Sequence, residues 1–319
     1  MLYSNLIRPL LFKLPAETAH DITIRQLELL QNSFMGRGLI KLLSGHVESN
    51  PVQVMGLNFR HPVGLAAGLD KDAKVIRGLF QMGFSHIEVG TLTPKGQPGN
   101  DKPRLFRLKE DHALINRMGF NNEGSIAASR RLRKRDPNWG VVGGNVGRNK
   151  ITNNENAIDD YIASMSHLRD YVDYFTVNIS SPNTPGLREL QQEEVLKNLL
   201  TRISDDNSKS FKPRPLAVKI SPDLSKQEVQ SISRLAVTCG FNGIIGTNTT
   251  VNRIGLKTKA NRIKDAGSGG LSGRPLARHS TDVVAWIKEA VGDSAAVIGV
   301  GGVFNAQDVI DKRNAGADL

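Results

Sequence analysis

Residues 174–183 read Tyr-Phe-Thr-Val-Asn-Ile-Ser-Ser-Pro-Asn, a short apolar run that ends in a cluster of polar side chains. A strand of a parallel sheet gives this pattern because other elements cover both of its faces. The pattern recurs along the chain, and each run precedes a stretch long enough for a helix. The predicted strands are 62–68, 86–91, 141–147, 174–180, 215–221, 243–248, 295–302 and a last one that begins at Ala317.

Helices are expected between these strands, at 73–82, 124–135, 158–168, 192–204, 226–239, 281–291 and 306–314. Eight alternating units favour a closed (β/α)8 TIM barrel over an open sheet. Most of the strands end in small or polar residues, and in a barrel these ends share the face on which active sites are built. The sequence therefore predicts one α/β domain, a barrel at 45–319, preceded by an extension at 1–44.

The extension differs in character from the rest of the chain. Leu2, Leu6, Leu10 and Leu14 recur at helical spacing, and a second periodic segment runs from 16 to 30. We expect two short amphipathic helices here. They form either an ordinary packed extension or a hairpin that lies in the headgroup region of a bilayer.

The composition excludes several kinds of site. The one cysteine, Cys239, allows neither an internal disulfide nor a four-cysteine metal centre, and the scattered histidines predict no metal site. The net charge of +11 suits an acidic substrate, an anionic membrane or nucleic acid. No aromatic residue interrupts the basic run 130–135, which favours a solvated helix end over a nucleic-acid site.

Three groups of residues at the strand ends indicate a ligand. Gly299, Gly301 and Gly302 end the seventh strand, where barrels commonly hold a phosphate on backbone amides. Lys71 and Lys219 lie at the rim, where a partly buried ammonium requires negative charge nearby. Amide side chains that donate and accept suit a small planar ligand such as a pyrimidine; they are Asn116, Asn121, Asn145, Asn178, Asn183 and Asn248. Each asparagine or glycine alone is also compatible with an ordinary turn.

These motifs closely resemble those of dihydroorotate dehydrogenase of class 2, the membrane-associated, quinone-using class. The resembling segments are AAGLDKD at 66–72, GTLTPKGQPGNDKPRLFRL at 90–108, INRMGFNN at 115–122, VNISSPNTPGLR at 177–188, TNTT at 247–250, GGLSGRPL at 269–276 and IGVGG at 298–302. The resemblance covers essentially the whole chain. It implies oxidation of dihydroorotate to orotate in pyrimidine biosynthesis, with FMN as hydride acceptor and a quinone as final acceptor. It also implies a peripheral enzyme at the cytoplasmic face of the cell membrane, without a nucleic-acid or iron–sulfur partner.

The resemblance implies roles for individual residues. Ser181 matches the catalytic base, a position at which the soluble classes of the family have cysteine. The residues that match FMN contacts are Ala67, Gly68, Lys71, Thr91, Asn145, Asn178, Lys219, Thr247, Gly273 and Gly302. The residues that match substrate contacts are Lys71, Asn116, Arg117, Met118, Gly119, Phe120, Asn178, Asn183, Asn248 and Thr249. His20 and Arg104 match positions that line a quinone tunnel.

One departure from the family pattern affects the expected fold. Family members continue beyond the eighth strand into a tyrosine–serine segment that helps bind the FMN phosphate and then into a final helix, whereas this sequence ends at Leu319. We therefore expect a truncated eighth βα unit, weak FMN binding and reduced stability. Two rival hypotheses are another FMN barrel, such as a tRNA dihydrouridine synthase with its active-site cysteine, and a non-catalytic remnant that no longer holds flavin.

Overall fold

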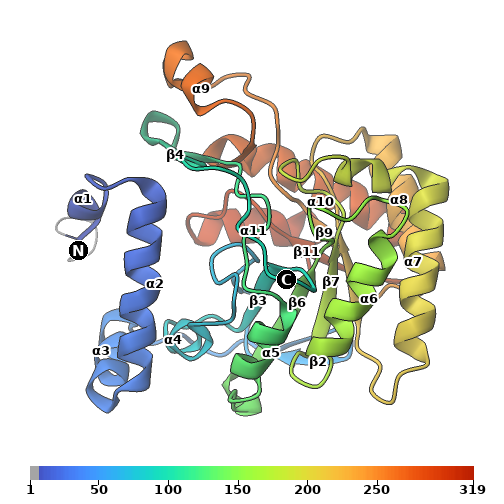
Figure 1. Cartoon of the computed structure of the whole chain (residues 1–319), viewed down its shortest axis with the longest axis horizontal. Helices are drawn as coiled ribbons and strands as arrows, with labels where there is room; N and C mark the ends of the chain where they lie inside the picture. The colour runs from blue at the N-terminus through green and yellow to red at the C-terminus, as the bar shows by residue number, and fades with distance from the viewer. Residues whose placement is uncertain (1–6) are drawn as a thin grey trace.

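The computed structural model describes residues 7–319, in which helices and strands alternate along most of the chain (Figure 1). The main sheet of this described part has six parallel strands in the order β11-β9-β8-β7-β6-β3. They are β3 (His86–Leu92), β6 (Val141–Val146), β7 (Tyr174–Asn178), β8 (Leu216–Lys219), β9 (Gly243–Gly246) and β11 (Ala296–Gly299). Because strands that follow one another in the predicted series are also neighbours in the sheet, six of the eight predicted strands are confirmed.

Helices cover the outer face of this sheet. They are α4 (Ile76–Gln81), α5 (Ser125–Leu132), α6 (Ala157–Leu168), α7 (Glu193–Ser208), α8 (Lys226–Thr238), α10 (Ala277–Val291) and α11 (Ala306–Asn314). Every residue of β3, β6, β7, β8 and β9 is buried, as expected for strands with both faces covered. The largest apolar cluster lies between these strands and helices, and all seven helices overlap the predicted ranges.

The two ends of the predicted strand series are not regular strands in this structure. Segment 62–68 makes one parallel bridge, from Leu65 to Ile87 of β3. At the other end, the Gly299 amide of β11 donates to the Leu319 carbonyl over 2.9 Å. A cavity of about 260 Å³ lies between these two flanks, so the described sheet is a curled parallel half-barrel. Each flank has a strand on one side only, which leaves it without the second ladder that regularises an inner strand.

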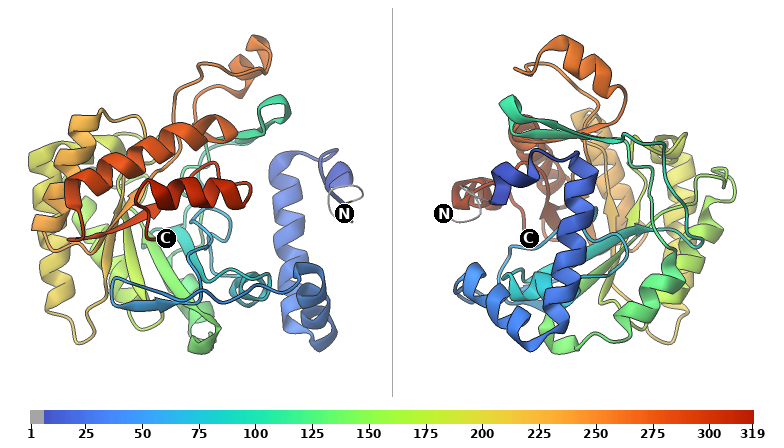
Figure 2. Two further views of the ribbon diagram at one scale, coloured as in Figure 1. Left: turned by 180° about the vertical axis from the view of Figure 1, so that it is seen from behind. Right: turned by 60° about the vertical axis from the view of Figure 1, so that its left-hand side comes forward.

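Small antiparallel sheets lie at the two ends of the half-barrel. The hairpin of β1 (Val52–Val54) and β2 (Leu57–Phe59) buries Phe59 against the first residues of β6 and β7. The opposite, carboxyl end carries a sheet of β4 (Leu105–Leu108), β5 (Ala113–Asn116) and β10 (Gly270–Gly273). Figure 2 shows β4 and the short helix α9 (Ala260–Ala266) projecting beyond this end.

Three helices precede the barrel and stand beside it as a separate group (Figures 1 and 2). They are α1 (Arg8–Leu11), α2 (Ala16–Asn32) and α3 (Phe34–Ser44). The prediction of a helix at 16–30 is confirmed by α2. The predicted helix before it is a single turn among the described residues, and Leu2 and Leu6 lie outside them. Helix α3 was not predicted because Gly36 and Gly38 lower its intrinsic helix propensity.

The helical group is attached to the barrel by polar contacts of α2. The Gln31 amide donates to the Lys74 carbonyl over 2.6 Å and accepts from the Gly78 amide over 2.9 Å. Near the start of α2, the Glu17 carboxylate accepts from the Arg104 guanidinium over 2.8 Å. Within residues 7–319, no helix has the combination of length and apolar character that crossing a membrane requires.

The turn between α2 and α3 gives a matched pair of glycine substitutions. A methyl group added at Gly36 would clash with the Leu30 carbonyl oxygen, whereas one at Gly38 would meet nothing within 4 Å. We therefore expect Gly36→Ala to destabilise the pairing of α2 and α3 by about 1–3 kcal/mol. Gly38→Ala should stabilise the helix by up to about 1 kcal/mol. Limited proteolysis of the 33–44 segment in the two variants tests this; equal cleavage rates would contradict the close turn.

Candidate active site

A cavity of about 390 Å³ opens at the carboxyl ends of the parallel strands, beneath the β10-β5-β4 sheet. Most of the residues singled out in the sequence line it. From the strand ends and their loops these are Ala67, Gly68, Lys71, Thr91, Asn178, Ser181, Asn183, Lys219, Thr247, Asn248 and Thr249. The β5 strand and its following loop add Asn116, Met118, Gly119 and Phe120. The fold therefore brings together residues as distant in the chain as Ala67 and Thr249, which are 182 positions apart.

A network of amide side chains forms the floor of this cavity. The Asn178 amide donates to Thr91 Oγ1 over 2.9 Å and to Asn145 Oδ1 over 3.3 Å. Asn178 Oδ1 in turn accepts from the Asn248 amide over 3.2 Å. These residues come from the ends of β3, β6, β7 and β9. Asn145 is fully buried, so it does not line the cavity but fixes the orientation of Asn178 and Thr91 from below.

Beneath the amides lies Glu88, a buried carboxylate that the sequence reasoning did not select. It accepts from Asn145 Nδ2 over 2.8 Å, from Thr176 Oγ1 over 2.7 Å and from the Tyr174 hydroxyl over 3.3 Å. The sequence did contain a signal for it, because an acidic residue in the middle of the apolar run 86–92 indicates a buried, hydrogen-bonded carboxylate. Its bonds complete the hydrogen-bonding of the floor.

Two lysines give the cavity a positive charge. Burial lowers the pKa of Lys219, and the carboxylate of Glu88 partly opposes this shift. Within residues 7–319, Lys219 Nζ has neither a hydrogen-bond acceptor nor an ion pair. Burial also lowers the pKa of Lys71, whose ammonium donates to the Gly68 carbonyl over 2.7 Å. A bound anion would offset the burial of both ammonium groups.

The loop 181–183 closes one side of the cavity. Ser181 is 5% exposed, and its Oγ accepts from the Asn183 amide over 3.2 Å. The Asn183 side chain donates to Asn116 Oδ1 over 2.9 Å. In the described chain, Asn183 Oδ1 is buried and has no donor, so it is an open acceptor in the wall of the cavity.

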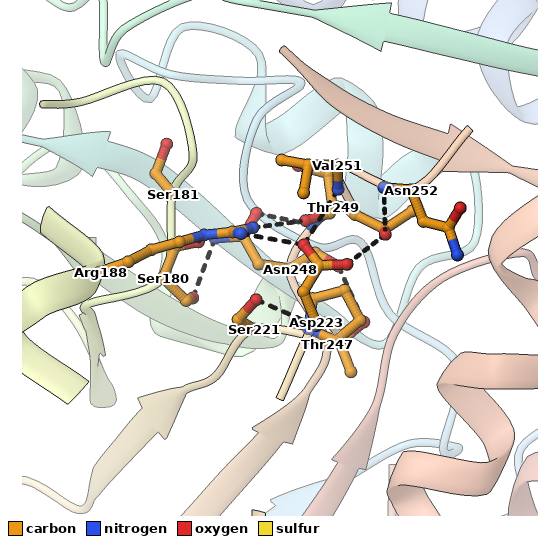
Figure 3. A network of polar contacts seen from close by, with 12 residues as sticks. Ser180, Ser181, Arg188, Ser221, Asp223, Thr247, Asn248, Thr249, Val251 and Asn252 are labelled. Atoms are coloured by element: carbon orange, nitrogen blue, oxygen red, sulfur yellow. Dashed lines mark hydrogen bonds and ion pairs between the residues drawn. The ribbon is translucent and has the colours of Figure 1, made fainter. Parts of the chain in front are cut away.

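An ion pair behind the cavity connects the loops that follow β7, β8 and β9 (Figure 3). The Arg188 guanidinium contacts Asp223 Oδ2 over 2.9 Å, and it donates to the carbonyls of Ser180 and Thr249 over 3.2 Å each. Asp223 also accepts from the Val251 amide over 2.9 Å. Figure 3 shows Arg188 extending from the side of Ser180 toward Asp223 and Thr249. This ion pair holds the loops after β7 and β9 in place. The spacing of Arg188 and Asp223 along the sequence did not predict the pair.

Some of the residues selected from the sequence lie outside the cavity. The Arg117 guanidinium donates to the carbonyls of Pro103 and Ala266, so it supports the neighbouring loops. Gly273 is absent from the cavity lining, although its neighbour Ser272 belongs to it, and Gly302 lines the adjacent cavity between the two flanks of the sheet.

The two residues assigned to a quinone tunnel lie at different depths. His20 lines the cavity, and burial, followed by the charge of Lys71, lowers its pKa to about 4. His20 is therefore neutral at neutral pH. Arg104 is buried against Glu17, a partner that the sequence reasoning missed, and against the carbonyls of Pro98 and Asn100. It joins α2 to the loop at 98–104 and does not line the cavity.

The family described as dihydroorotate dehydrogenase matches residues 50–319. The chain belongs to the dihydroorotate dehydrogenase family. A dihydroorotate dehydrogenase (quinone) of Christiangramia forsetii is 47% identical to it, over 100% of this chain and 92% of that protein. One of Chromobacterium violaceum is 45% identical, over 100% of this chain and 91% of that protein.

Solved structures of other dihydroorotate dehydrogenase family members have the same fold. A ligand-free DHODH from Eimeria tenella superimposes with a TM-score of 0.80 at 36% identity, covering 90% of this chain and 87% of that one. The same protein in complex with ferulenol gives a TM-score of 0.78 at 35% identity, covering 90% of this chain and 84% of that one. The resemblance stated from the sequence motifs is confirmed.

The loop clamp gives a prediction about stability. Asp223→Ala should destabilise the protein by about 2 kcal/mol, because it leaves the Arg188 guanidinium and the Val251 amide without their acceptor. The exposed Asp282 is a control, since Asp282→Ala removes the same charge from a surface position. Denaturant unfolding of both variants is the measurement. Equal midpoints for the two would contradict the role of the clamp.

Proposed function

We propose that this chain oxidises dihydroorotate to orotate in pyrimidine biosynthesis, with bound FMN as hydride acceptor and a quinone as final acceptor. The observation that carries the proposal is the combination in one cavity of Ser181, four asparagines, the buried Lys219 and the half-buried Lys71. Amides that donate and accept match the ring carbonyl and N–H groups of a pyrimidine, and the lysines match anionic groups. The names of the relatives support the same reaction.

The residues of the cavity fit a flavin mononucleotide. Lys219 Nζ is a buried cation without a partner in the described residues, and it suits the electron-rich side of a flavin ring. Gly68 has a φ of +118° and would meet nothing within 4 Å if it carried a methyl group, so the backbone there is open to a flat ligand. Gly301 and Gly302, whose backbone amides have no acceptor in the described residues, supply amides for the phosphate. We infer that Ala67, Gly68, Thr91, Asn178, Lys219 and Thr247 hold the cofactor, with Asn145 behind them and Gly273 and Gly302 at the phosphate end.

When bound, FMN supplies the two-electron acceptor that dihydroorotate oxidation requires. The chain orients the substrate: Asn183 Oδ1 offers its open acceptor to a substrate N–H group, and Asn116, Asn178 and Asn248 surround the rest of the ring. Lys71 faces the substrate carboxylate. Met118, Gly119, Phe120 and Thr249 complete the wall, while Arg117 acts on it through the loops that its guanidinium holds.

Ser181 Oγ takes the proton from substrate C5. A serine hydroxyl keeps its own proton at neutral pH, so it requires positioning and onward transfer of the proton it accepts. The backbone N–H of Asn183 positions the Ser181 hydroxyl by donating to Oγ, and the 5% exposure of Ser181 keeps bulk water away from the reacting atoms. Cys239 lies at the end of α8, where its thiol contacts Thr201 over 3.5 Å, so it is not part of this cavity. A mechanism based on an active-site cysteine is thereby disfavoured.

The N-terminal helices provide the path for the quinone. His20 of α2 lies in the wall of the cavity and is neutral, which suits an uncharged ring approaching from the side of the helices. Leu10, Met35 and Leu42 are 57%, 85% and 79% exposed, an unusual extent for apolar side chains of neighbouring helices. We infer that residues 1–44 attach the enzyme peripherally to the cytoplasmic face of the cell membrane. We also infer that the half-barrel and its two flanks together form the (β/α)8 barrel expected at 45–319.

The proton acceptor can be tested with the chain supplied with excess FMN. Ser181→Ala should retain FMN but reduce it with dihydroorotate about 100 to 10,000 times more slowly, the usual effect of losing a general base. Ser181→Cys should recover part of the rate, because a thiol can also accept the proton. Stopped-flow flavin bleaching measures both rates. An unchanged rate in Ser181→Ala would refute the assignment.

Membrane attachment can be tested with a triple variant, Leu10→Gln, Met35→Gln and Leu42→Gln. It should bind neutral lipid vesicles more weakly and oxidise vesicle-borne quinone more slowly, while flavin reduction by dihydroorotate is unchanged. The control replaces Ile151, Phe211 and Ile254, which are 85%, 107% and 89% exposed, with glutamine. Vesicle sedimentation and quinone turnover should stay at the level of the unmodified chain in this control. Equal losses in both triple variants would contradict attachment through the helical group.

A further inference from the structure

A second cavity, of about 480 Å³, lies between the helical group and the amino-terminal end of the barrel. It shares no lining residue with the catalytic cavity. Its walls come from the end of α3 and the segment after it, from Arg60 after β2, from α4 and from Trp139 before β6. The proposed reaction gives this cavity no role.

The cavity is lined by cations and by no acidic side chain. Lys41 of α3, Arg60 and Arg77 of α4 meet here, together with His46. In the described residues none of the three cations forms an ion pair, although the chain has many partly exposed carboxylates. An uncompensated convergence of positive charge attracts an anion.

The two arginines are held in position. Arg60 Nη2 donates to the Gly83 carbonyl over 3.3 Å. The guanidinium of Arg77 lies 5.2 Å from the centre of the Trp139 ring. Each guanidinium still has donors to spare, and a planar group with several N–H donors matches the oxygens of a phosphate. Ordered arginines lose less conformational entropy on binding than free ones.

We propose that this cavity binds a phosphate-bearing anion, and that its source is the headgroup of an anionic phospholipid. Lys41 is adjacent to Leu42, which is 79% exposed, and Phe34 and Met35 of the same helix are 84% and 85% exposed. Acyl chains against this apolar surface would place the headgroup beside Lys41. The inference rests on the membrane attachment proposed above and adds a specific lipid site to it.

A buried amide in the same cavity favours a headgroup that carries a hydroxyl group. Gln81 lines the cavity, and within residues 7–319 its buried Oε1 has no hydrogen-bond donor. A glycerol hydroxyl would donate to it; if the amide is turned over, its NH2 group would donate to a phosphate oxygen. Phosphatidylglycerol offers both groups.

The test compares two doubly substituted full-length chains that lose the same charge. Arg60→Gln with Arg77→Gln removes the two arginines of the cavity. Lys197→Gln with Arg202→Gln removes two exposed cations of α7, on the opposite side of the molecule from α3 (Figure 1). Each chain is sedimented with phosphatidylcholine vesicles that contain or lack phosphatidylglycerol. Calorimetry with inorganic phosphate forms a separate arm.

We expect the unmodified chain to prefer the phosphatidylglycerol vesicles, and the arginine variant to bind them about 30 times more weakly, the effect of two basic residues at an anionic surface. The α7 variant should lose little, and binding to neutral vesicles should be the same for all three chains. Lys41→Gln should also lower the preference for phosphatidylglycerol vesicles. Because Lys41 lies on α3 and not in the barrel, this variant controls for a folding defect in the arginine double variant.

Three results would overturn the proposal, and they differ from a failure of membrane attachment. Equal losses in the arginine and α7 variants would show only a general charge effect. An unmodified chain that binds neutral and phosphatidylglycerol vesicles equally would have no anionic-lipid site. Binding of inorganic phosphate that depends on the arginines, without any lipid preference, would assign the cavity to a free phosphate. A chain that binds no vesicle at all would instead refute the attachment itself.

Discussion

The structure depends on the requirement that buried polar groups be hydrogen-bonded where the parallel strands β3, β6, β7 and β9 end. Asn178 satisfies this requirement for its neighbours, because its amide bonds Thr91 and Asn145 while its carbonyl accepts from Asn248. Glu88 completes the set from below. A shift of any one strand along its neighbour would leave a buried amide without a partner. The network therefore fixes the strand register and the shape of the cavity together.

Hydrogen bonds and ion pairs also hold the loops above the network. Arg188 holds the loops on either side of the cavity through Ser180 and Thr249, and it is itself neutralised by Asp223. Ser181 can be buried and correctly placed because its immediate neighbour in the chain is held in this way. On the other side, Arg104 and Glu17 tie the helical group to the loop that borders the site. The shape of the cavity thus depends on residues that do not line it.

Much of this could be predicted from the sequence because local signals were strong. The sequences of fully buried strands such as β7 are continuous apolar runs, which predicted the strands. The polar residues at the ends of these runs predicted the cavity. Other features could not be predicted. The flanks at 62–68 and 317–319 look like strands, but each has a neighbour on one side only. Helix α3 was not predicted, because Gly36 lowers the helix propensity of its sequence. The turn after α2 requires this glycine, since a larger side chain would clash with the Leu30 carbonyl oxygen. The pairs Arg188–Asp223 and Arg104–Glu17 join residues 35 and 87 positions apart, so only the folded chain reveals them.

We propose that this cavity holds FMN and that the hydride of bound dihydroorotate passes to the flavin. The most direct measurement is an anaerobic titration of the unmodified chain, supplied with FMN, in which flavin absorbance and orotate are followed together. We predict bleaching of the protein-bound flavin with formation of orotate in equal amount, and no bleaching of free FMN under the same conditions. Bound flavin that stays oxidised in the presence of dihydroorotate, or bleaching without orotate, would contradict the account.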